Sequence, residues 1–332
     1  MTLSPAAVRG LIRKLSHSQQ EELFQDLRPW IDQMGVGAKA GLNLQEFRER
    51  RFHAGLKCPH CNDSKVKKNG TFLDKRKMRR QRYLCKVCGK AFGDFTGTPL
   101  AGTHRADLWP AMTKRLLDGR SLRQTAAELG ISLGTAFAWR HKLLAAHRDG
   151  KAPNMTGIVE ADETFFRVSN KGKRGLKRKP RRRGEVPLHW EPKVDLACVV
   201  VAQDRRGQSA ARHVGRGQRR GAAIRRLLEA VMARSATLCS DGAQVYRKFC
   251  KDKGIRYRCV MPRKRLKKGA IYHLNHVNNW HSRFKSAVNH RFKGVATKYL
   301  DNYAAWQVLC DKVKAVNPNT AAKRAIFEAC AA

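Results

Sequence analysis

The apolar positions in residues 1–50 recur at the spacing of an α-helix. Ser18 is placed to cap a helix, and Glu21 follows three residues later, as in a capping box. The apolar side of this helix is made by Leu23, Leu27 and Ile31. We therefore expect a small helical N-terminal element, whose simplest role is to pack against the rest of the chain.

Residues 51–100 change to the patterning of strands. The stretch VKKNGTFLDKRKMRRQRYLC, at 66–85, indicates two strands around a turn, and GKAFGDFTGTPL follows it. These strands lie between two C-x-x-C pairs, and pairs at this separation are the arrangement of a zinc ribbon.

Residues 105–150 return to helical spacing, most clearly in SLRQTAAELGISLGTAFAWRHKLL at 121–144. Gly130 turns the chain, and Ser132 can cap a second helix. The residues expected to pack are Ala126, Ala127 and Leu129 on the first helix and Phe137, Trp139 and Leu143 on the second. A helix-turn-helix of this kind presents the start of its second helix to the DNA major groove. The alternative is a helical hairpin inside a core.

Residues 155–310 alternate between strand and helix signals. The stretch GIVEADETFF is a strand in which Ile158, Glu160 and Asp162 share one face. A hairpin follows, with its turn near Arg206 and Gly207.

The second half of this region begins with AAIRRLLEAVMAR, a helix with an apolar stripe made by Ile224, Leu227, Leu228 and Val231. A short strand ending in Asp241, a helix and a fifth strand come next, and residues 273–290 form a last helix. Three antiparallel strands followed by alternating helix and strand predict an α/β fold of the ribonuclease H-like kind. Residues 311–332 are expected to be a C-terminal tail.

The charge of the chain points to a polyanionic partner. Lys and Arg number 69 against 26 Asp and Glu, for a net charge of +43 at pH 7. Nucleic acid fits best, because each neutralised phosphate releases a condensed counterion. A membrane surface is the rival, but no apolar run is long enough to span a bilayer and no signal peptide is apparent. We expect double-stranded DNA as the partner, no membrane, and a cytoplasmic, nucleoid-associated protein.

Basic residues concentrate in two insertions of the α/β region, at 168–193 and 262–271. The run KGKRGLKRKPRRR at 171–183 holds nine Lys or Arg and no acidic residue, and RKRLKK at 263–268 is the second run. Such runs are ordinarily solvated. Their expected work is contact with DNA phosphates, which adds affinity without selecting a sequence.

Four of the ten cysteines form two C-x-x-C pairs, Cys58 with Cys61 and Cys85 with Cys88. Two such pairs at this separation predict one tetrahedral zinc ion held by four thiolates. The site is expected to be structural, because four thiolates leave no open coordination position. His60 lies inside the first pair and is expected to be a bystander, and the other six cysteines are expected to be small buried apolar residues.

Two aspartates, Asp162 and Asp241, are predicted to meet at one edge of the sheet because their strands are neighbours in the proposed fold. Gly242 follows the second aspartate and lets the chain turn away. A pair of carboxylates suits Mg²⁺ or Mn²⁺, which keep open positions for phosphate oxygens. Two such ions assist phosphodiester cleavage in many enzymes.

Four stretches together resemble the ISXO-like group of DDE-type insertion-sequence transposases, which is related to the Merlin superfamily. They are EADET, LCSDGAQVY, HLNHVNNWHSRFK and GVATKYLDNYAAW. The resemblance covers roughly residues 55–310, with the zinc ribbon and the helix-turn-helix included. It implies a ribonuclease H-like catalytic domain, divalent metal, and cleavage and rejoining of transposon ends in target DNA by at least a dimer.

The resemblance also assigns residues. Asp162 and Asp241 match the first two metal-binding aspartates of the family. Asn278 stands where many relatives carry glutamate, which makes this chain an Asp-Asp-Asn variant, and Lys285 matches a basic residue seven positions further on. An amide oxygen is a legitimate ligand for a hard cation, although it brings no charge. The alternative is that Asn275 caps the helix and Asn278 is an ordinary first-turn residue.

Three functions are therefore weighed. The first is an active transposase that cleaves and transfers DNA strands with Mg²⁺ or Mn²⁺. The second is a DNA-binding regulator derived from a transposase with an inactive catalytic domain, against which the two intact aspartates argue. The third is a zinc hydrolase using His273, His276, His281 and His290. The spacing of these histidines is not that of H-E-x-x-H, and no general-base glutamate lies beside them in the sequence.

Overall fold

The computed structural model describes most of the residues after residue 41 and a few of the residues before it. The described residues are 12, 15, 16, 18–23, 26, 42–74, 78–176, 196–217, 221–261 and 270–331. The chain divides into two compact units, Met1–Leu42 and Asn43–Ala332. Both basic runs fall largely outside the described residues, since the structure describes only 171–176 of the first and none of the second. Among the described helices, none is long and apolar enough to cross a membrane.

In the N-terminal unit, the described residues include a helical stretch at 18–23. Its cap is not Ser18, which lies inside the helical stretch, but Ser16. The Ser16 hydroxyl accepts the N–H of Gln19, and the Gln19 side chain accepts the N–H of Ser16. This is a capping box two residues earlier than predicted, because Ser and Gln fill the same two roles at Ser16 and Gln19.

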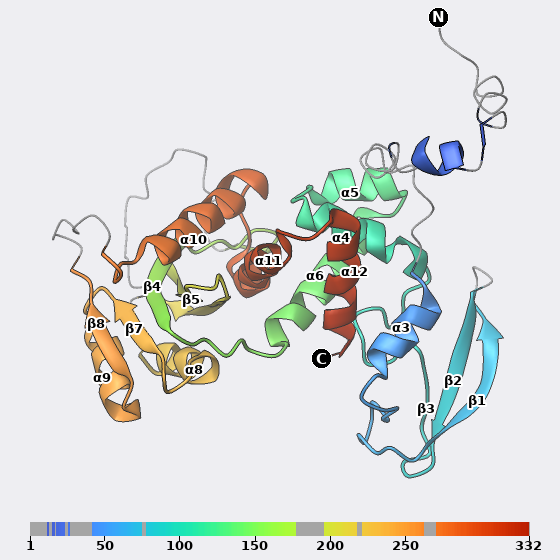
Figure 1. Cartoon of the computed structure of the whole chain (residues 1–332), viewed down its shortest axis with the longest axis horizontal. Coiled ribbons are helices and arrows are strands. Elements are labelled where there is room, and N and C mark those ends of the chain that lie inside the picture. Colours follow the sequence, from blue (N-terminus) through green and yellow to red (C-terminus); the bar gives the residue numbers. More distant parts are fainter. Residues whose placement is uncertain are drawn as a thin grey trace, which may run out of the picture. The chain divides into compact units, whose positions relative to one another are not determined.

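The cysteine-bearing region has one helix and one small antiparallel sheet (Figure 1). Helix α3 (Leu44–Arg51) precedes β1 (Val66–Leu73), β2 (Arg79–Cys85) and β3 (Ala91–Gly93), which pair in the order β1-β2-β3. The predicted pair of strands is confirmed. The expected boundary at residue 50 falls inside α3, which is attached to the sheet: the buried carboxylate of Asp94 accepts two hydrogen bonds from Arg48, at 2.9 and 3.0 Å.

The helical region begins with the short 3-10 helix η1 (Ala106–Leu108) and α4 (Trp109–Leu117), followed by α5 (Leu122–Leu129) and α6 (Leu133–Asp149). Ser132 caps α6 by accepting the N–H of Thr135, and Gly130 takes the left-handed conformation that ends α5. Of the expected packing residues, Ala127 is exposed and Phe137 is partly exposed, whereas Ala126 is buried. Helix α5 buries Thr125 and Ala126, and Ala127 lies on its exposed side.

The α/β region is built on a five-stranded sheet. Its strands are β4 (Ile158–Arg167), β5 (Leu196–Asp204), β6 (Ser209–Arg216), β7 (Thr237–Ser240) and β8 (Arg256–Cys259), in the order β6-β5-β4-β7-β8. The first three pair antiparallel, and β7 and β8 add in parallel on the other side of β4. The predicted strand sequence and the adjacency of β4 and β7 are confirmed.

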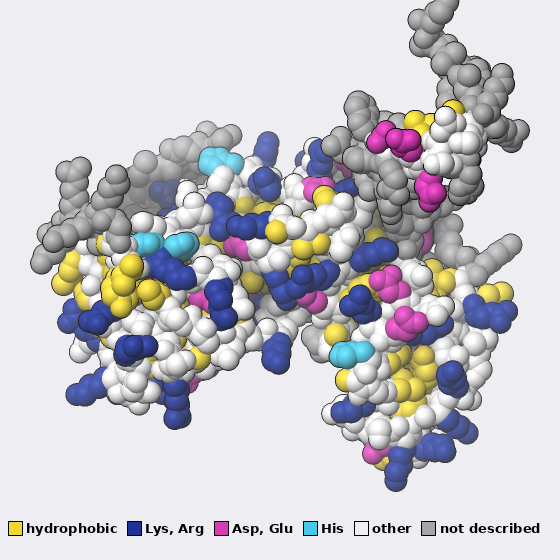
Figure 2. Space-filling view, in the orientation of Figure 1, with side chains coloured by type: hydrophobic (Ala, Val, Ile, Leu, Met, Phe, Trp, Pro, Cys, Tyr) yellow, Lys and Arg dark blue, Asp and Glu magenta, His cyan; other side chains and the backbone are white. Residues whose placement is uncertain are grey.

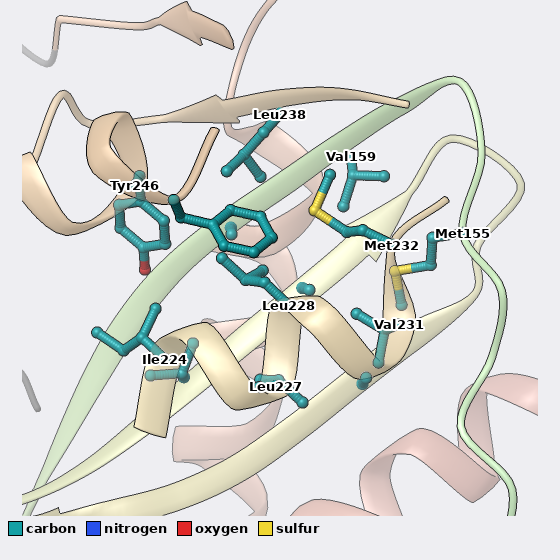
Figure 3. Packing of buried hydrophobic residues seen from close by; sticks show 14 of the residues in the cluster. Met155, Val159, Ile224, Leu227, Leu228, Val231, Met232, Leu238 and Tyr246 are labelled. Carbon is teal, nitrogen blue, oxygen red and sulfur yellow. The ribbon is translucent and has the colours of Figure 1, made fainter. Parts of the chain in front are cut away.

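Each face of this sheet is covered by helices (Figure 1). On one face, α8 (Gly221–Val231) and α9 (Gln244–Lys253) close a core with inward residues of β4, β5 and β7. Figure 3 shows the predicted stripe of α8 pointing at Val159, Leu238 and Tyr246. The other face is covered by α10 (Asn275–Ser286), whose buried residues include Val277, Trp280 and Phe284.

The chain does not end in a tail. After α10 come one π-helical turn, η2 (Ala287–Arg291), the 3-10 helix η3 (Thr297–Tyr299), α11 (Leu300–Val313) and α12 (Pro318–Ala331). Helix α12 buries Ala321, Ala325 and Ile326 and contacts α3, α4 and α6. The segment looked like a tail because alanines supply its buried face. Alanine is a strong helix former but a weak signal of burial.

Candidate functional site

The four cysteines of the two C-x-x-C pairs come together at one end of the three-stranded sheet. Their sulfur atoms lie within 4.8 Å of one another, with Cys58 Sγ 3.7 Å from Cys88 Sγ and Cys61 Sγ 3.6 Å from Cys85 Sγ. Backbone N–H groups point at the sulfurs, and those of Cys88 and Val87 lower the pKa of the Cys85 thiol to about 7. The cluster offers four thiolate donors in the arrangement that zinc prefers. His60 is exposed and donates only its backbone N–H, at 3.4 Å, to Cys58 Sγ.

The two aspartates sit on neighbouring strands of the five-stranded sheet. The parallel ladder between β4 and β7 pairs Glu160 with Cys239 as its last register position, so Asp162 of β4 and Asp241, the residue directly after β7, each lie two residues beyond that pair. The Asp162 side chain is 23% exposed and points to the face covered by α10. Asp241 accepts the N–H of Ala243 at 3.1 Å, which holds its carboxylate at the end of β7.

Gly242 permits the turn directly after Asp241 for two reasons. Its φ is +91°, a conformation that other residues rarely adopt, and a Cβ atom there would lie 2.7 Å from Cys259 Sγ on β8. The glycine therefore combines backbone freedom with close packing, and both keep the carboxylate of Asp241 at the sheet edge.

Below the aspartates, on the opposite face of the sheet, Tyr246 of α9 is fully buried and donates its hydroxyl hydrogen to Glu163 at 3.0 Å. Burial raises the pKa of Tyr246 well above its usual value, and the negative charges of Glu163, Asp162 and Asp241 raise it further.

Helix α10 carries the remaining predicted residues. Asn278 and Lys285 are exposed and lie seven positions apart, which returns them to almost the same side of the helix. Between them, His281 is buried with its Nδ1 atom 4.0 Å from Oδ2 of Asp162, so this side of α10 faces the first aspartate. Burial, followed by the charge of Lys285, lowers the pKa of His281 to about 4, and its imidazole is therefore neutral at pH 7.

The cap of α10 is a residue that sequence reasoning did not assign. The helix begins at Asn275 with Leu274 as its N-cap residue, and no side chain of the helix caps it, so the alternative role for Asn275 is wrong. Instead, Glu160 of β4 accepts the N–H groups of His276 and Val277, at 2.9 and 3.0 Å. The sequence offered one signal for this role, because Glu160 was predicted on the same strand face as Asp162.

Among the described residues, two groups of side chains bring at least three possible metal ligands within 4.8 Å of one another. They are the four cysteines and the set of Glu160, His273 and His276. The two aspartates belong to neither group. The histidines considered for a zinc hydrolase do not all lie together. His273 and His276 lie next to Glu160, whereas His281 faces Asp162.

Comparisons with known proteins find similarity to one transposase domain and to a protein of a transposable element. Residues 154–308 match the model of the ISXO2-like transposase domain. An uncharacterised protein in transposable element ISH50 of Halobacterium salinarum is 30% identical over 140 residues, which are 42% of this chain and 45% of that protein. The match thus spans less than half of that relative's length.

A solved structure, the pre-cleavage Mos1 transpososome, aligns with 65% of this chain and 78% of its own chain at 11% identity. Its TM-score of 0.25 is too low to establish a shared fold. The match of residues 154–308 covers the five-stranded sheet, both aspartates and all of α10. Residues 154–308 are therefore similar to the ISXO2-like transposase domain, over a little less than half of the chain.

Proposed function

We propose that this protein is a DNA transposase of the DDE type, in an Asp-Asp-Asn form, that binds transposon ends and performs metal-dependent strand cleavage and strand transfer. Two observations support the proposal. Asp162 and Asp241 each lie two residues beyond the last pair of the β4–β7 ladder, and Asp162 lies beside His281 on the side of α10 that also bears Asn278. The order of three antiparallel strands followed by two parallel strands supports a ribonuclease H-like catalytic domain.

The residues fit a pair of hard divalent cations. Asp162 and Asp241 supply carboxylate oxygens at one edge of the sheet, and Asp162 keeps part of its side chain open to solvent. Asn278 adds a neutral amide oxygen from an exposed position. Oxygen donors with open positions suit Mg²⁺ or Mn²⁺. Such ions, when bound, activate a water molecule and stabilise the leaving oxygen in phosphodiester cleavage.

The side chains around this set have separate tasks. Tyr246 and Glu163 fix the sheet from below through a buried hydrogen bond, so the backbone beside Asp162 is held firmly. The neutral imidazole of His281 fills the space between α10 and Asp162 without adding a competing cation. Lys285, exposed one helical turn beyond His281, is placed to contact a DNA phosphate.

DNA binding is assigned to the rest of the molecule. Figure 2 shows Lys and Arg side chains spread over the face in view, with fewer carboxylates between them, as the net charge of +43 requires. We assign α5 and α6 as a helix-turn-helix because the first residues of α6, Ser132 to Gly134, are exposed while its later residues pack on α11. The three-stranded sheet with its cysteines is assigned as a zinc ribbon.

The test is nicking of labelled DNA from the ends of the element. We expect the wild-type protein to cut at the terminus with Mg²⁺ or Mn²⁺ and to stop when the metal is chelated. A regulator derived from a transposase would bind the same DNA and never cut it. Binding without metal-dependent cutting would therefore overturn the enzyme assignment.

A further inference from the structure

A second charged cluster lies next to the proposed catalytic residues, and its centre is Glu160. This carboxylate is completely buried, two positions before Asp162 on the same face of β4. Its Oε2 atom accepts the N–H groups of His276 and Val277. One oxygen of Glu160 therefore joins β4 to the first turn of α10, and the residue that follows Val277 is Asn278.

The other oxygen of Glu160 faces a cation. Nη1 of Arg205, in the turn between β5 and β6, lies 2.7 Å from Oε1 of Glu160. The same nitrogen is 2.9 Å from Nε2 of His273 and 2.6 Å from Nδ1 of His276. Nη2 of Arg205 donates to the carbonyl oxygen of Ile271, at 2.9 Å.

Glu160, His273 and His276 have the composition of a metal site, two imidazoles and one carboxylate. The guanidinium nitrogen stands at the point between them that a metal ion would take. A permanent cation already neutralises the buried carboxylate, and a second one would have to displace Arg205. The two imidazole rings stack on each other with centroids 5.2 Å apart, which closes the cluster on one side.

We propose that Arg205 is the cation held by Glu160, His273 and His276. Glu160 and Arg205 together are positioning residues: they hold α10, and with it Asn278, against Asp162 before any catalytic metal binds. The roles of Asn278 and Asp162 in this proposal rest on the proposed function. The clamp itself rests on geometry. It joins β4, the β5–β6 turn and the start of α10 through one buried carboxylate, and α10 has no side-chain cap of its own.

The first experiment measures hydrogen exchange in the metal-free full-length protein. Arg205→Gln leaves Glu160 buried without its cation, so the amides of His276 and Val277 should exchange on the order of tenfold faster or more. Arg206→Gln is the matched control. Arg206 is the next residue of the same turn, its side chain is 59% exposed, and it pairs with Asp204 at 3.5 Å rather than with Glu160. Equal exchange in the two variants would overturn the clamp.

The second experiment measures the Mg²⁺ concentration that half-saturates DNA strand cleavage. If the clamp positions Asn278, Arg205→Gln should raise this concentration about tenfold, while Arg206→Gln leaves it unchanged. A lower maximal rate with an unchanged metal requirement would overturn the positioning role. Should the wild type not cleave DNA, the proposed function fails, whereas the exchange experiment still decides whether the clamp exists.

Two further measurements separate the clamp from its rivals. Glu160→Gln keeps an oxygen for the α10 amides and removes the charge. Combining it with Arg205→Gln should therefore restore slower exchange than Arg205→Gln alone, and no restoration would contradict a charge pair. Zn²⁺ titration tests whether the set takes metal. We expect equal zinc stoichiometry for the wild type and His276→Ala, and one zinc fewer in His276→Ala would show that metal, not Arg205, is the resident cation.

Discussion

The cysteine cluster and the aspartate pair bring their proposed metal ligands together in opposite ways. Four sulfur donors come from two short loops on one small sheet, and they already lie within 4.8 Å of one another. The aspartates come from two strands of a larger sheet, and the proposed third ligand comes from a helix on its face. The first set is organised by local spacing, whereas the second depends on the whole domain.

The difference extends to the surroundings of each set. Around the cysteines, the support is a small core of Tyr83 and Phe92, together with backbone N–H groups directed at sulfur. Around the aspartates, the support comes from two buried carboxylates. Glu160 forms an ion pair with Arg205 on one face of the sheet, and Glu163 accepts a hydrogen bond from Tyr246 on the other face. A structural metal site can replace a core, but the proposed catalytic site needs a rigid domain to aim its ligands.

The largest effect is expected from Cys85→Ser. A structural zinc contributes on the order of 10 kcal/mol to local folding, so the three-stranded sheet should lose its metal and its hydrogen-exchange protection. The amides of β4 and β5 should keep theirs, because their core is separate from the cysteine cluster. Cys259→Ser, at an exposed cysteine outside the cluster, is the control. Full zinc content in Cys85→Ser would mean that the cysteines do not form one site.

The next effect concerns the aspartates. Asp162→Asn and Asp241→Asn should each slow strand cleavage by about 10³-fold, since a lost ligand charge removes several kcal/mol of transition-state stabilisation. Binding to end DNA should persist, because neither aspartate is among the residues proposed to contact DNA phosphates. Glu229→Gln, at an exposed acid on α8, serves as the control. If either asparagine variant cuts at the wild-type rate, that aspartate has only a structural role.

A smaller effect is expected from Gly242→Ala. The substitution meets both an unfavourable φ and a 2.7 Å approach to Cys259 Sγ, and should lower the free energy of unfolding by about 2–3 kcal/mol. Gly254→Ala shares the positive φ, +67°, but has open space around its Cβ, and should cost about 1 kcal/mol. Urea unfolding compares the two. Equal losses of unfolding free energy in the two variants would show that the close approach to Cys259 does not require glycine at the turn after Asp241.

The smallest effect is expected at Asn278, the proposed uncharged metal ligand. Asn278→Ala should raise the Mg²⁺ concentration needed for half-maximal cleavage about tenfold, and Asn278→Asp should lower it if the shorter carboxylate reaches the ion. Asn279→Ala is the matched control, because Asn279 is the adjacent exposed asparagine and accepts a hydrogen bond from Arg283 at 2.9 Å. An unaltered metal requirement in Asn278→Ala would remove this residue from the ligand set.

Much of the fold was predictable because its signals are local. Alternation identified β4, and helical spacing identified the buried stripe of α8. Two predictions were wrong because the local sequence gave no clear signal. Helix α12 buries alanines, which give little sign of burial in a sequence. Ser16 and Ser18 could each cap the N-terminal helix, and the backbone conformation places Ser16 in that role.

For the sites, the sequence by itself determined the four cysteines, because two C-x-x-C pairs at this separation are the pattern of a four-thiolate site. It also determined that Asp162 and Glu160 share one strand face, because side chains alternate along a strand. Only the tertiary structure decided what Glu160 touches. Its partners, Arg205 and the first turn of α10, come from distant parts of the chain, and no sequence period relates them. A buried charge is stable only beside its partner, and that pairing exists only after β4, the β5–β6 turn and α10 have packed together.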